Sequence, residues 1–153
     1  MPENLEEYAH HKITQAYLNR HPVLRIRKQD EEYYITYKGS GMMSREEYNL
    51  PLNKEGFEHL LEKADPSVIS KTRYLIPLPN PVFEEGFKGP FPGPLMIELD
   101  VFDPPHAPLV MAEVEFPDEE SARAFQMPDW FSEDVTGDPH YHNSNLSDPN
   151  FPR

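Results

Sequence analysis

The segment IELDV at residues 97–101 decides the fold, because its apolar and charged side chains alternate strictly. In a β-strand successive side chains point to opposite faces, so residues two apart share a face. Three other segments repeat this alternation: LRIRK (24–28), SKTRY (70–74) and AEVEF (112–116). The sequence therefore predicts strands that each carry one ionic face and one apolar face.

Each ionic face carries charges of a single sign. The pairs are Arg25 and Arg27, Lys71 and Arg73, Glu98 and Asp100, and Glu113 and Glu115. An ordinary half-exposed strand shows similar alternation with its charges in water. Four such pairs in so short a chain instead favour a charged interior or groove, with cationic and anionic strands. That arrangement suits a polyanion and the metal ions that accompany it.

Length and net charge narrow the classes of partner. The chain has 153 residues, which is enough for one domain with a buried core. It carries 27 Asp and Glu against 14 Lys and Arg, for a net charge of −13. Such a chain repels nucleic acid and anionic membranes at long range, so neither is an expected partner. An anion would have to bind where basic residues gather locally.

Several functional classes are excluded by what the sequence lacks. It has no cysteine, which rules out disulfides, thiolate metal sites and thiol nucleophiles. It has no glycine-rich phosphate loop, no G-x-S-x-G elbow and no H-E-x-x-H motif. We expect neither a signal peptide nor a membrane span, and by default a cytoplasmic location.

Local signals place the remaining elements. Strands are predicted over residues 13–18, 23–28, 33–38, 44–50, 68–76, 96–102 and 110–116. Asn53 is a favourable N-cap for a helix that ends near Asp65, and a short helix is predicted from Asp118 to Phe125. Residues 77–94 are rich in proline and predict a long loop.

The chain ends carry weaker signals. Residues 1–12 predict a polar N-terminal segment and residues 147–153 a tail, both belonging to a single domain over 1–153. After about Ser132 the sequence lacks periodicity, so no regular element is predicted there.

These segments together carry a family resemblance. The runs RIRK, YYITYKG, ISKTRYLI, IELDVF and AEVEFPDEESARAF, then PDWF and VTGDPHYHNSNL, resemble the CYTH domain, the triphosphate tunnel metalloenzyme family. The resemblance extends from Ile13 to Leu146. It implies an α+β, mainly antiparallel fold: a closed or nearly closed β-barrel tunnel with flanking helices. It also implies metal-dependent hydrolysis of a triphosphate, foremost inorganic tripolyphosphate to pyrophosphate and phosphate.

The resemblance implies a role for each charged residue that matches the family pattern. The residues implied to bind substrate phosphate are Arg25, Arg27, Lys38, Lys71 and Arg73. Those implied to bind the metal, Mg²⁺ or Mn²⁺, are Glu113, Glu115, Asp100 and Glu98. The catalytic residues would be Glu47, Glu113 and Glu115. Guanidinium groups suit phosphate oxygens, and carboxylates suit hard divalent cations. The same acids could instead pair with the tunnel bases.

Three departures from the family pattern qualify these expectations. The family opens with a Glu-x-Glu-x-Lys strand, and residues 1–8 resemble only the loop that would follow it. Either the sequence is truncated or it is a natural variant without that strand. The unpaired edges left behind predict a homodimer or strand exchange. Asn49 replaces a family glutamate, and His140 lies where a basic residue is common.

Alternative functions also remain open. An enzyme of the same fold could act on thiamine triphosphate, or cyclise ATP as class IV adenylate cyclases do. A chain without its first metal-binding strand could instead bind polyphosphate or nucleotides without catalysis.

Overall fold

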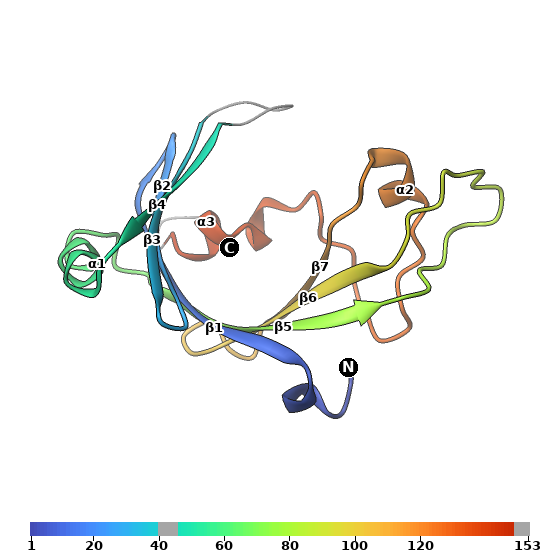
Figure 1. Cartoon of the computed structure of the whole chain (residues 1–153), viewed down its shortest axis with the longest axis horizontal. Coiled ribbons are helices and arrows are strands. Elements are labelled where there is room, and N and C mark those ends of the chain that lie inside the picture. Colours follow the sequence, from blue (N-terminus) through green and yellow to red (C-terminus); the bar gives the residue numbers. More distant parts are fainter. Residues whose placement is uncertain (40–45, 149–153) are drawn as a thin grey trace.

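The computed structural model in Figure 1 describes residues 1–39 and 46–148. Within these residues one antiparallel sheet has seven strands in the order β4-β3-β2-β1-β5-β6-β7. The strands are β1 (Ala9–Arg20), β2 (Val23–Gln29), β3 (Glu32–Lys38), β4 (Glu47–Leu52), β5 (Ile69–Leu78), β6 (Leu95–Phe102) and β7 (Val110–Val114). The helices are η1 (Leu5–Glu7), α1 (Lys54–Leu61), α2 (Glu119–Ala124), η2 (Pro139–Tyr141) and α3 (Asn143–Leu146).

The sheet curves into a trough, with β1 and β5 as its floor and β2–β4 and β6–β7 as its two sides (Figure 1). The predicted mainly antiparallel fold with few helices is confirmed. The sheet is not closed into a barrel, however: in the described part of the chain β4 and β7 are edge strands that do not pair. The C-terminal segment with η2 and α3 lies between the two sides instead (Figure 1).

The outer, convex face of the sheet is apolar and holds most of the core. Helix α1 packs Phe57 against Ala16 of β1 and Ile26 of β2. A second cluster, under η1 and the Trp130–Phe131 segment, is built from Ile76, Ile97 and Leu99. Burial of this face is what drives the sheet to form, because its apolar side chains leave water.

Helix α1 begins where the sequence predicts. The Asn53 side chain accepts a 2.6 Å hydrogen bond from the Gly56 backbone N–H, as an N-cap should. The helix ends at Leu61, short of the predicted Asp65. The last turn tightens, because the N–H groups of Lys63 and Ala64 bond to carbonyls three residues earlier, and Asp65 donates to Tyr17 O instead.

The structure corrects several predicted boundaries. Strand β1 begins at Ala9, so part of the predicted polar segment 1–12 is strand, because it pairs with β5 from Ala9↔Leu75 onward. The region after Ser132 contains η2 and α3, two single turns too short to show periodicity. Of the strand predicted over 44–50, residues 44 and 45 lie outside the described residues, and residues 47–50 belong to β4, which extends to Leu52 and pairs with β3.

The proline-rich stretch lies between β5 and β6 and is anchored to α2. The Glu84 backbone N–H donates to Ala124 O at 2.7 Å, and Phe83 packs against Phe87, Phe91 and Phe125. Among the described helices none is long and apolar enough to cross a membrane.

Candidate anion and metal site

The inner, concave face of the sheet carries the ionic side chains. Cross-strand pairing places Arg25 opposite Thr36, Arg27 opposite Gln15, Arg73 opposite Asp100, and Glu98 opposite Glu113. Residues that face each other across a ladder share a side of the sheet. The predicted charged groove is therefore this inner face, whereas Ile26 and Leu99 point to the outer core.

Arg25 and Arg27 form the cationic centre of the β2 side. Each is only 8% exposed, and no carboxylate in the described residues pairs with either guanidinium. Burial, and next the neighbouring Arg27 charge, lower the pKa of Arg25. Two buried like charges without a counterion are costly, so an anion bound beside them would be stabilising.

Neutral side chains hold these two arginines. Arg27 donates from Nε and Nη2 to Gln15 Oε1 at 2.9 and 2.5 Å. Arg25 Nη2 lies 3.4 Å from Thr36 Oγ1, and Thr36 donates to Asn49 Oδ1 at 2.5 Å. These contacts fix the side chains and leave the positive charges uncompensated.

A pocket of about 340 Å³ opens beside the two arginines, lined by Arg25, Arg27, Tyr34, Glu47 and Asn49. Glu47 lies at its rim with a half-exposed side chain, and Lys38 Nζ is 3.7 Å from Glu47 Oε1. The structure therefore brings three of the predicted phosphate ligands and one predicted catalytic acid to one end of the inner face.

Lys71 and Arg73 are placed differently, because Asp100 neutralises them. Lys71 Nζ donates to Asp100 Oδ2 at 2.7 Å, and Arg73 donates to the same carboxylate from Nε and Nη2 at 2.7 and 2.9 Å. Arg73 Nη1 also lies 2.6 Å from Glu98 Oε2. Lys71 is fully buried and Asp100 is 3% exposed, so this cluster is a buried part of the inner face.

The protonation of this cluster follows from burial and pairing. Burial opposes ionisation of Asp100, but the bonds from Arg73 and Lys71 outweigh it and lower the pKa of Asp100. Burial lowers the pKa of Lys71 despite Asp100. Burial also tends to lower the pKa of Arg73, but the hydrogen bonds to Asp100 outweigh burial and raise that pKa. The three side chains thus form a buried, hydrogen-bonded cluster.

The acidic side of the trough offers donors for a metal. Glu98 and Glu113 face each other across β6 and β7, and Glu115 follows β7 in exposed chain. The described residues contain no cluster of three His, Cys, Asp or Glu that could hold a metal ion. Carboxylate oxygens such as those of Glu98, Glu113 and Glu115 are ligands that suit a hard divalent cation.

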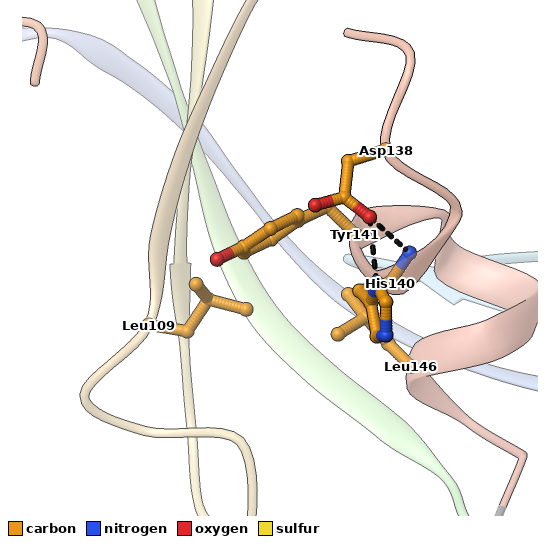
Figure 2. Close-up of a pocket in the computed structure, with 5 residues that line it drawn as sticks. All are labelled: Leu109, Asp138, His140, Tyr141 and Leu146. Atoms are coloured by element: carbon orange, nitrogen blue, oxygen red, sulfur yellow. Dashed lines mark hydrogen bonds and ion pairs between the residues drawn. The ribbon is translucent and has the colours of Figure 1, made fainter. Parts of the chain in front are cut away.

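A second pocket, of about 420 Å³, lies between the β6–β7 connection and the C-terminal segment (Figure 2). Its lining residues are Leu109, Asp138, His140, Tyr141 and Leu146. Asp138 Oδ1 accepts hydrogen bonds from the backbone N–H of His140 at 2.9 Å and from its Nδ1 at 2.7 Å. The His140 imidazole is therefore oriented by a carboxylate.

The C-terminal segment is fastened over the floor by two basic side chains. Arg20 of β1 donates to Ser144 O and, at 3.2 Å, to Ser147 O. His106 Nε2 donates to Leu146 O at 2.9 Å, and Leu146 packs on Ile69 and Phe102 of the inner face.

Sequence reasoning missed two buried polar residues of the inner face, Gln15 and Thr36, both fully buried. Neither carries a charge, so neither stood out. The available signal was position: Gln15 shares a strand face with Ile13 and Tyr17, and Thr36 shares one with Lys38.

The described inner face buries Arg25 and Arg27 without carboxylate partners and carries acidic side chains on β6 and β7, which is typical of a protein that binds an anion. The CYTH domain model matches residues 4–120. The chain therefore belongs to the CYTH domain family.

Similar proteins agree with that assignment. The chain is 38% identical over 124 residues to an inorganic triphosphatase of Nitrosomonas europaea, which covers 81% of this chain and 74% of the relative. It is 38% identical over 128 residues to an inorganic triphosphatase of Acetivibrio thermocellus, which covers 80% and 70%. A crystal structure of an inorganic triphosphatase matches with a TM-score of 0.68 at 33% identity, over 96% of this chain and 87% of that one.

Proposed function

We propose that this protein is an enzyme that hydrolyses inorganic tripolyphosphate to pyrophosphate and phosphate, with Mg²⁺ or Mn²⁺. The observation that carries the proposal is the pair Arg25 and Arg27, buried side by side with no carboxylate partner among the described residues. The similarity to proteins named inorganic triphosphatase supports it.

The cationic residues would hold the polyphosphate straight along the trough. Arg25, Arg27 and Lys38 lie at the open pocket, and Arg73 and Lys71 lie on the floor strand β5. Guanidinium forks contact phosphate oxygens in pairs, whereas lysine acts as a point charge. Phosphoryl transfer needs little more from a protein than this positioning and neutralisation of charge.

Glu98, Glu113 and Glu115, with Asp100 behind them, would hold the divalent metal. When bound, Mg²⁺ or Mn²⁺ would neutralise charge on the phosphate oxygens. Glu47, at the pocket rim, would accept a hydrogen bond from the attacking water and take its proton. Asp100, which accepts hydrogen bonds from Lys71 and Arg73, would hold both side chains in place while the substrate binds.

The expected partners follow from the same site. The substrate would be a small-molecule triphosphate, with no nucleic acid or membrane involved, in the cytoplasm. A homodimer or strand exchange at the β4 or β7 edge would extend the trough toward a tunnel.

The test is phosphate release from tripolyphosphate with Mg²⁺, with Mn²⁺ and with a chelator. Replacing a carboxylate that faces the metal removes charge stabilisation, so Glu115→Ala should lower the rate about a hundredfold with folding intact. Glu133→Ala, an exposed acid of the C-terminal segment, is the matched control. Undiminished activity in Glu115→Ala would contradict the assignment, and tight binding without any turnover would indicate a binding module.

A further inference from the structure

Gln15 is a buried residue of β1 that lies in contact with the cationic centre. Its side chain is fully buried, and its backbone faces Arg27 on β2 and Ile69 on β5. Its Oε1 accepts both hydrogen bonds that Arg27 donates from Nε and Nη2, at 2.9 and 2.5 Å. Gln15 is thus as central to the inner face as the arginines are.

The orientation of this amide is fixed by chemistry. A guanidinium group can only donate, so the Gln15 atom that faces Arg27 must be the oxygen. The amide nitrogen is then directed elsewhere, and Nε2 is buried without a hydrogen-bond partner among the described residues. Arg25 Nε, on the neighbouring strand β2, is also buried without a hydrogen-bond partner among the described residues. Buried donors normally have an acceptor, and a ligand bound beside the described residues could supply oxygens to both N–H groups.

We propose that Gln15 is a substrate-binding residue whose Nε2 donates a hydrogen bond to a phosphate oxygen of tripolyphosphate. Its Oε1 meanwhile holds the Arg27 guanidinium in place, so one side chain both orients a cation and binds the anion. The acceptor must be rich in oxygen and negatively charged, because Arg27 faces Gln15 on β2, Arg25 lies two residues before Arg27, and neither has a carboxylate partner among the described residues. This inference rests on the proposed function and adds a neutral donor to its cationic set.

The direct test observes the amide itself in the wild-type protein. Tripolyphosphate is titrated in the presence of a chelator while the side-chain amide resonances of Gln15 and Gln126 are followed by NMR after standard assignment. The Gln15 resonances should shift and saturate with the affinity measured by calorimetry. Those of Gln126, an exposed residue after α2, should stay in place. Binding that leaves the Gln15 resonances unmoved overturns the proposal.

The variant Gln15→Glu adds an independent readout. Glutamate keeps an acceptor oxygen for Arg27, loses the donor and adds a negative charge beside Arg27. Weaker binding is therefore expected, and an unchanged affinity is incompatible with contact between Gln15 and the anion. We expect tripolyphosphate to bind about tenfold or more weakly, the scale of one hydrogen bond to a charged group, with the melting temperature maintained. Gln126→Glu adds the same charge at an exposed position and should bind as the wild type does.

The outcomes separate the two proposals. Equal affinity of Gln15→Glu and wild type, with tripolyphosphate still hydrolysed, overturns the role of Gln15 and leaves the proposed function standing. A wild-type protein that neither binds nor hydrolyses tripolyphosphate overturns the proposed function, and the role of Gln15 with it.

Discussion

Asp100 is the residue on which the buried charges of the floor depend, since its carboxylate pairs with both Lys71 and Arg73. Asp100→Asn would leave the fully buried Lys71 ammonium without a negative partner. Removing one member of a buried ion pair costs about 3–5 kcal/mol, so urea denaturation should show a loss of that order. Glu119→Gln, in an exposed pair with Arg123, is the control and should barely change stability. Comparable losses in the two variants would contradict the dependence on Asp100.

The same carboxylate predicts how stability changes with pH. Although burial opposes it, hydrogen bonding to Arg73 and Lys71 lowers the pKa of Asp100 in the folded state. A lowered folded-state pKa means that the stabilisation is present above the unfolded value, about 3.9, and is lost as pH falls through the folded value. The free energy of unfolding should therefore fall on acidification below about pH 4. The decline should be shallower in Asp100→Asn, and equal slopes would rule out this cause.

Arg25 is expected to lower the stability of the folded state and to strengthen anion binding. Its guanidinium is buried next to Arg27, and both burial and that neighbouring charge lower its pKa, so the folded state carries a cost. Arg25→Met should raise the free energy of unfolding by about 1 kcal/mol while weakening tripolyphosphate binding in calorimetry. Lys28→Met removes the same charge from the outer face of the same strand, and should leave binding unchanged. A variant that loses stability together with affinity would show that Arg25 is structural.

At the scale of elements, the sequence predicts the features that depend on neighbouring residues, namely strands, their two faces and helix starts. The alternation around Arg25 and Asp100 correctly gave the strands and their faces, and Asn53 correctly gave the start of α1. Helix α3 was missed because a single turn has no period to detect, and β1 was predicted too short because His10, His11 and Lys12 look like a polar coil. Sheet closure depends on which edges meet in space, which no local pattern specifies.

Helix α1 offers a prediction that separates fold from function. Asn53→Ala removes the acceptor for the Gly56 N–H, and loss of an N-cap costs about 1 kcal/mol of stability. Because α1 covers the outer face, the rate of phosphate release should be unchanged at temperatures where the variant is folded. Thermal unfolding and the phosphate assay measure the two effects on one sample. Asn53→Asp retains an acceptor and should restore stability, whereas a destabilised Asn53→Asp would mean that the cap is not the cause.

For the whole molecule, the net negative charge repels an anion at long range, whereas the arginines of the inner face attract it at short range. The chain carries a net charge of −13, yet the buried arginines of β2 are the groups that an anion would meet on the inner face. Long-range repulsion and short-range attraction therefore act on the same ligand. Since the repulsion is screened by salt while the buried contacts are screened much less, moderate ionic strength should not abolish binding.

Tripolyphosphate should therefore stabilise the whole fold, because it supplies the countercharge that Arg25 and Arg27 lack among the described residues. At a hundred times its dissociation constant, a ligand that binds only the folded state adds about 2.7 kcal/mol. Thermal unfolding with a chelator present, to prevent turnover, should show a rise in melting temperature that grows with tripolyphosphate concentration. Sulfate at matched ionic strength is the control for general salt effects, and Arg25→Met should show a smaller rise. An equal rise with sulfate would mean that the inner face does not recognise the polyphosphate chain, and the same stabilisation in Arg25→Met would place the anion away from β2.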